Sequence, residues 1–203
     1  MKHLKMLALA ITAAICVIAF AGAGSANATV LCKTATNPCT SAYPKGTKFR
    51  ATLKTGTITK FEAGAGNVEC EGSEMEGEVT EAGGKGVTVT IPLGKWSFSL
   101  CKGTVTVIVK PKIIVHWKPI FRFSWTFKAV IEITLHLTGG VSCTYGSTTG
   151  EINVGESVGE PTSELTVESS LPKLAGGFLC ASSAKWTGAY TLNEPTPLYA
   201  AES

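Results

Sequence analysis

The residues most suggestive of catalysis are 155–159, Gly-Glu-Ser-Val-Gly, which match the G-x-S-x-G pattern of a serine nucleophile. That pattern works where a strand turns sharply into a helix and presents the serine above a parallel sheet. Here Glu-Pro-Thr follows, and the chain continues into the strand-like residues 165–167, Leu-Thr-Val. We therefore attribute the match to chance and predict no nucleophile at Ser157.

His116 and His136 are the imidazoles that remain after the first 28 residues. A general base needs a nucleophile and an orienting acid nearby, and the acid close in sequence is Glu132. All 15 acidic residues are glutamates, so EF-hand loops and Ser-His-Asp triads are excluded. We interpret both histidines as exposed strand residues and expect no catalytic site.

Glutamates crowd residues 62–81, where a hairpin turn is predicted at residues 72–73, Gly-Ser. Such a hairpin places Glu71 opposite Glu74 and Glu69 opposite Glu76, with Glu78 on the same face. Like charges directly opposite each other are destabilising, so this face requires cations. Calcium is one candidate, because it prefers carboxylate oxygens. Ion pairs with a lysine-bearing neighbouring strand are favoured, since strand carboxylates rarely surround a metal ion as a loop does.

The middle of the chain is basic and lacks glutamate between Glu81 and Glu132. Its candidate anion-binding residues share the polar face of one alternating stretch: Lys110, Lys112, Lys118, Arg122 and Lys128. An acidic cell-envelope polymer or a membrane surface would suit this face. No nucleic acid is expected, because the nearby aromatic residues at 121, 123, 125 and 127 lie on the opposite, apolar face.

The N-terminus predicts export. Lys2, His3 and Lys5 precede an apolar run, and Ala26 and Ala28 occupy the −3 and −1 positions of an A-x-A cleavage site. We expect a signal peptide at residues 1–28 and a single mature domain at 29–203, secreted or held in the cell envelope.

Six cysteines follow the expected cleavage site, and an even number in an exported chain indicates disulfides. The pairing we favour among the fifteen possible ones is Cys32–Cys39, Cys70–Cys101 and Cys143–Cys180. Zinc is disfavoured, because no C-x2-C pair occurs and few histidines remain.

Strands must position all these residues. From Val105 to Leu137 every odd residue is apolar, whereas most even residues are polar, which predicts strands with one buried face. A single strand of that length would be longer than a compact domain is wide. We therefore expect the chain to fold back near Pro111 and Pro119, because proline is disfavoured inside a central strand. Because odd-numbered residues point inward along the whole stretch, each connection between its strands must contain an odd number of residues, or else a bend or a bulge.

Elsewhere the positions of the inward-facing residues change at short Gly- or Ser-containing segments. This pattern predicts a repeated cysteine-bearing hairpin. The expected turns lie at residues 72–73, 146–147 and 182–184. Inward residues before these turns include Cys70, Cys143, Phe178 and Cys180. An inward glycine on each return strand is expected to make room beside the sulfur: Gly77, Gly150 and Gly188.

Together these patterns predict an all-β, disulfide-bonded fold, an antiparallel β-sandwich with a closed β-barrel as the alternative. A chain rich in Thr, Gly and Cys whose end carries residues 186–190, Trp-Thr-Gly-Ala-Tyr, and 195–199, Pro-Thr-Pro-Leu-Tyr, resembles uncharacterised secreted proteins of soil actinobacteria. The resemblance implies secretion and β-structure and assigns no activity or cofactor.

For function, we expect a non-enzymatic extracellular binding module, or one associated with the cell envelope. The alternative is a membrane-active or pore-forming β-protein, because lipid-facing strands alternate in the same way. A hydrolase with an unrecognised site ranks third.

Overall fold

The computed structural model describes residues 29–64, 66–84, 87–108, 111–117, 125–137, 139–158 and 161–202. The expected signal peptide at residues 1–28 lies outside this part of the chain.

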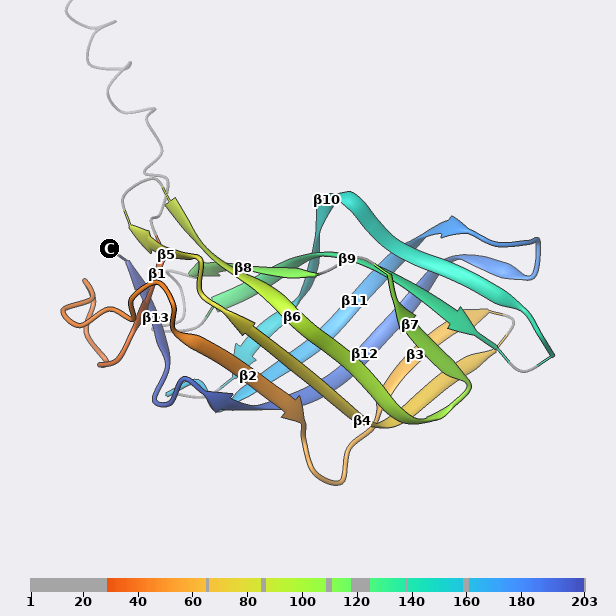
Figure 1. Ribbon diagram of the computed structural model, residues 1–203, viewed down its shortest axis with the longest axis horizontal. Coiled ribbons are helices and arrows are strands. Elements are labelled where there is room, and N and C mark those ends of the chain that lie inside the picture. The colour runs from red at the N-terminus through yellow and green to blue at the C-terminus, as the bar shows by residue number, and fades with distance from the viewer. Residues whose placement is uncertain are drawn as a thin grey trace, which may run out of the picture.

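The described residues form thirteen strands, and every pairing between strands is antiparallel (Figure 1). The strands are β1 (Thr29–Cys32), β2 (Lys48–Leu53), β3 (Thr59–Gly64), β4 (Asn67–Glu78), β5 (Glu81–Gly84), β6 (Val87–Lys102), β7 (Thr104–Val107), β8 (Lys112–Trp117), β9 (Trp125–His136), β10 (Ser142–Val158), β11 (Glu164–Ala175), β12 (Cys180–Glu194) and β13 (Tyr199–Glu202). The expectation of an all-β, antiparallel fold is confirmed. No helix long and apolar enough to span a membrane occurs among these residues.

Eight of the strands form a closed circuit of pairings: β6–β8–β9–β10–β11–β12–β2–β4 and back to β6. Opposing walls of this sheet face each other across one shared core, as in a sandwich, and the two walls are joined along both sides. The remaining strands extend the sheet at its ends.

Alternation decides which residues enter the core. In β9 the odd residues from Phe127 to Leu135 are fully buried, as are Ile113 and Val115 of β8, as the sequence predicts. Trp117 pairs with Trp125, so seven residues separate the two strands, an odd-length connection that preserves parity. The chain therefore does fold back across the segment that contains Pro119.

The predicted fold-back near Pro111 is wrong. Strands β7 and β8 both pair with β9 in the same direction, so the chain continues along one edge of β9. The register differs between the two pairings, with Val107 opposite Ile133 and Lys112 opposite Val130. A bulge thus accommodates the proline, which cannot donate to the ladder.

The three predicted cysteine hairpins are also wrong, because each expected turn lies inside one uninterrupted strand: β4, β10 or β12. The inward parity does change at Gly72–Ser73, since both Cys70 and Ser73 are buried. However, β4 continues past this point while paired to β6 on one side. In β10 and β12 the register shifts, so bulges replace turns. Phe178, expected inside, is 94% exposed.

The predicted role of the inward glycines also needs correction. A Cβ at Gly77 would lie 2.5 Å from the carbonyl oxygen of Pro92, and one at Gly188 would lie 3.0 Å from the Thr59 hydroxyl. Gly150 falls outside the residues whose side chains are described. The glycine beside a sulfur is Gly176, where a Cβ would lie 2.5 Å from Cys180 Sγ.

All three favoured disulfides are present: Cys32–Cys39, Cys70–Cys101 and Cys143–Cys180. Their Cα atoms lie 5.8, 3.9 and 5.7 Å apart, respectively. Cys70 and Cys101 are directly opposite each other on β4 and β6. Three disulfides indicate an oxidising environment of the extracellular type.

Candidate functional site

An open groove of about 740 Å³ lies on the outer face of β2, β4 and β6. Its charged lining residues are three cations and three acids: Lys48, Arg50, Lys95, Glu76, Glu78 and Glu194. Gly77, Pro92, Leu93 and Gly94 contribute uncharged surface. Phe49 and Thr80 also line the groove. Most of its exposed lining is apolar, and the charged groups around it show no excess of either sign.

Strand alternation places these charged residues outside. On β2, Phe49 and Ala51 are buried, whereas Lys48 and Arg50 are exposed. On β4, Met75 is buried between Glu74 and Glu76. Cross-strand pairing then sets Lys48 opposite Glu78 and Arg50 opposite Glu76, so opposite charges meet.

A bulge opens the groove. Glu76 pairs with Lys95, but the next residue, Gly77, pairs with Leu93, which leaves Gly94 without a partner in the ladder between β4 and β6. Gly94 is exposed, and a Cβ built there has no atom within 4 Å. The missing side chain at Gly94 leaves the surface hollow.

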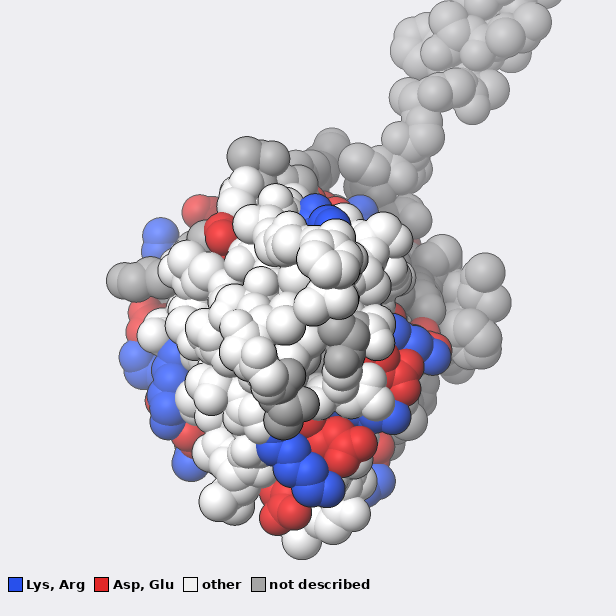
Figure 2. Space-filling model, turned by 90° about the vertical axis from the view of Figure 1, so that its right-hand side faces the viewer, with Lys and Arg blue, Asp and Glu red and all other residues white. Residues whose placement is uncertain are grey.

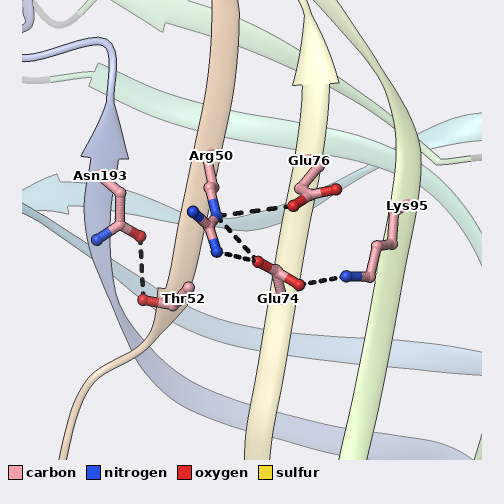
Figure 3. A network of polar contacts seen from close by, with 6 residues as sticks. All are labelled: Arg50, Thr52, Glu74, Glu76, Lys95 and Asn193. Carbon is pink, nitrogen blue, oxygen red and sulfur yellow. Dashed lines mark hydrogen bonds and ion pairs between the residues drawn. The ribbon is translucent and has the colours of Figure 1, made fainter.

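Glu74 is the centre of the polar network beside the groove (Figure 3). Its Oε1 accepts hydrogen bonds from Arg50 Nε at 2.9 Å and Nη2 at 2.8 Å, and its other oxygen accepts one from Lys95 Nζ. Arg50 also lies 3.6 Å from Glu76. Residues from β2, β4 and β6 thus hold one another in place across the three strands.

The network shifts the ionisation of its members. Hydrogen bonds from Lys95 and Arg50 lower the pKa of Glu74 to about 2. Hydrogen bonds to Glu74 raise the pKa of both Arg50 and Lys95. All three groups are therefore charged at neutral pH.

The predicted acidic hairpin face is replaced by ion pairs. Because β4 does not reverse, Glu71 and Glu69 do not face Glu74 and Glu76. Glu78 instead pairs with Lys48, and Glu69 lies 3.5 Å from Lys102. Lys95 and Lys102 come from the basic middle of the chain, as the ion-pair interpretation expects. Among the described residues, no group of three or more His, Cys or Glu is arranged to hold a metal ion.

Two of the five candidate anion-binding residues are described. Lys112 is exposed on β8, and Lys128 on β9 lies 3.6 Å from Glu151. Lys110, Lys118 and Arg122 lie outside the described residues. The candidate basic face is thus observed in part, and one of its lysines has an acidic partner.

The two histidines lie far apart, and Ser157 does not sit at a strand-to-helix turn. Ser157 is buried within β10, and β11 follows with no helix between the described residues. His116 of β8 lies opposite Thr126 of β9, and His136 is ten residues further along β9. At ~3.3 Å per residue, this separates the two histidines by roughly 33 Å along the strand.

The two histidines also differ in environment. His116 is half-buried rather than exposed. Burial is the main cause that lowers its pKa, and the positive charge of nearby Lys128 lowers it further. His136 is exposed, as expected, and its Nδ1 lies 2.9 Å from Ser142 Oγ.

A cluster of aromatic residues fills the core behind the groove. Trp96 and Trp186 have ring centroids 5.0 Å apart, and Phe61 stacks on Trp186 at 5.3 Å. Trp186 Nε1 donates to the Thr59 hydroxyl at 2.9 Å, and the Tyr190 hydroxyl donates to Ser73 Oγ at 3.1 Å. This cluster joins side chains of β3, β6 and β12, which are distant from one another in the chain.

No protein-family model, curated protein or solved structure matches this chain.

Proposed function

We propose that this protein is a non-enzymatic extracellular binding module, exported through the signal peptide at residues 1–28 and associated with the cell envelope. The observation that carries the proposal is the groove over β2, β4 and β6, with its ordered ion pairs. A binding surface of this kind needs a rigid support, which the closed circuit of strands and the disulfides supply.

The chemistry of the groove favours a ligand that has both polar groups and apolar faces and carries little net charge. Three cationic and three acidic side chains line it, so a strongly charged ligand of either sign meets repulsion as well as attraction. A polymer with many hydroxyl or amide groups could instead bond to carboxylates and ammonium groups that are already oriented. Neutral glycans of the cell envelope have this character.

The test is thermal unfolding of the oxidised protein with neutral glycans, acidic polysaccharides and calcium, because a ligand that binds the native state raises the midpoint. Gly94→Tyr fills the groove, and Gly94 has open space around its Cα. Thr88→Tyr adds the same side chain at an exposed position on the same strand and serves as the matched control.

We expect a neutral glycan to raise the midpoint of the wild type and of Thr88→Tyr but not of Gly94→Tyr. If the glycan still raises the unfolding midpoint of Gly94→Tyr, the ligand binds outside the groove. A shift with calcium alone, lost on replacing Glu69 and Glu71, would favour a metal site over the proposed polymer site.

A further inference from the structure

A second surface lies at the end of the long axis opposite β1 and β13, where four turns meet (Figure 1). We name it the distal tip and define it as the described residues of 64–67, 100–103, 137–141 and 174–179. The turns are in contact. Gly64 pairs with Cys180, a Cβ at Gly176 would lie 3.1 Å from the carbonyl oxygen of Ser142, and a Cβ at Gly103 would lie 2.9 Å from the carbonyl oxygen of His136. The tip is therefore one continuous surface.

Large apolar side chains project from the distal tip. Phe178 is 94% exposed and Leu100 is 77% exposed, and Leu174 and Leu179 are also exposed. These are four of the seven exposed large hydrophobic residues in the described chain. Single exposed leucines need no explanation, but a cluster at one end of a molecule marks an interaction site.

The tip is held rigidly and, at one residue, under strain. The disulfides Cys70–Cys101 and Cys143–Cys180 lie directly behind its turns. Leu100 has a φ of 52° and is the one non-glycine residue in the described chain with a positive φ. A bulky residue in that region is unfavourable, and such outliers persist at functional sites. Leu100 thus combines an unfavourable backbone conformation with a side chain that lies largely outside the core.

The charge of the tip is one-sided. Residues 63–68, 99–105, 136–143 and 171–184 contain Lys102, Lys173 and His136 but no acidic residue. Figure 2 looks onto this end: uncharged side chains cover most of it, and charged side chains gather towards its rim. The nearest glutamates are paired, Glu62 with Lys60 at 2.8 Å and Glu69 with Lys102 at 3.5 Å.

We propose that the distal tip docks on the surface of an anionic lipid bilayer. Phe178, Leu179 and Leu100 enter the interface, and Lys102 and Lys173 face the lipid phosphates. Side chains this exposed require no pocket of complementary shape in a bilayer, whereas a protein partner would have to supply one. The tip itself carries cationic but no acidic side chains, with Glu69 beside Lys102 just outside it, and this excess of positive charge matches the negative surface potential.

This inference deepens the envelope-associated role proposed above but uses a surface distinct from the groove. The tip alone contacts the lipid, so the closed sheet does not insert. Binding should therefore leave vesicles sealed, which separates docking from pore formation.

The experiment is co-sedimentation of the processed, oxidised protein with vesicles of phosphatidylcholine alone or with about one third phosphatidylglycerol, together with release of a trapped dye. The first variant is Phe178→Ser with Leu179→Ser, and the matched control is Ile58→Ser, which removes an exposed apolar side chain away from the tip. Leu100→Gly is a second variant, since glycine relieves the strained φ and should preserve folding.

We expect binding to the anionic vesicles, weakened by salt, with no dye release. The double variant should reduce the partition coefficient at least about tenfold, and Leu100→Gly should also reduce it, because each removes apolar surface from the interface. Ile58→Ser should bind as the wild type does. The proposal is overturned if the wild type stays in the supernatant or if both tip variants bind normally. A glycan shift lost in Gly94→Tyr would then leave the proposed function standing.

Discussion

The disulfides should differ in their contributions to stability according to the chain length that each one closes. The sequence separations are 37 residues for Cys143–Cys180, 31 for Cys70–Cys101 and 7 for Cys32–Cys39. Loop-closure entropy in the unfolded chain gives about 3.8, 3.7 and 2.4 kcal/mol for the three, respectively. The decisive perturbation compares Cys143→Ala/Cys180→Ala with Cys32→Ala/Cys39→Ala.

These two variants isolate the effect of loop length. Cys143, Cys180 and Cys32 are all buried, so sulfur removal leaves small voids in both variants. The expected difference in the free energy of unfolding is therefore about 1.5 kcal/mol, with the Cys143–Cys180 variant less stable. For a domain of this size that difference corresponds to about 3–6 °C in midpoint temperature.

The assay is equilibrium urea unfolding followed by tryptophan fluorescence, since Trp96 and Trp186 are both buried. The remaining disulfides must stay oxidised throughout. If the Cys32–Cys39 variant loses as much stability as the Cys143–Cys180 variant, or more, the entropic reasoning fails for this protein.

Two further predictions concern polar contacts. Glu74 has a folded pKa of about 2, below its ordinary value of 4.5, so its contribution is present above about pH 4.5 and is lost as the pH falls towards 2. Glu74→Gln should thus be less stable than the wild type at pH 7 and should lose less stability than the wild type between pH 5 and 2. The prediction is refuted if the urea midpoints of the two proteins fall by the same amount over that pH range. Tyr190→Phe should cost about 1–3 kcal/mol, because it removes the hydrogen bond to Ser73 and leaves that buried hydroxyl unsatisfied. In a double-mutant cycle with Ser73→Ala the two costs should not add, and strict additivity would argue against the bond.

Local pattern predicts much of this fold. The alternation between Val105 and Leu137 identifies the inward residues of β8 and β9, because side-chain direction in a strand depends on parity alone. The favoured disulfide pairs among the six cysteines after residue 28 are also correct, although the predicted cysteine hairpins are absent.

What sequence could not supply was the cause of a parity change. A turn and a bend inside a long strand both switch the inward face, and the choice depends on which distant strands provide hydrogen bonds. At residues 72–73 the partner β6 continues past the glycine, so β4 stays extended over twelve residues. At Phe178 the same misreading placed an exposed tip residue in the core.

The candidate site could be predicted only in part, because its ion pairs join strands that are distant in the chain. The excess of glutamates at residues 69–78 does demand cations, and ion pairing was the favoured interpretation. The partners Lys48 and Arg50 come from β2, however, and no local pattern identifies that strand as a neighbour of β4. The groove itself depends on a one-residue bulge at Gly94, which only the register reveals.

The most direct test of the central claim is co-sedimentation of the processed, oxidised protein with isolated bacterial cell envelopes. A binding module of the envelope should be retained saturably, and retention should fall in Gly94→Tyr or in the Phe178→Ser/Leu179→Ser variant, but not in Thr88→Tyr or Ile58→Ser. If the protein remains in the supernatant at every concentration and salt level, the envelope-binding role is contradicted.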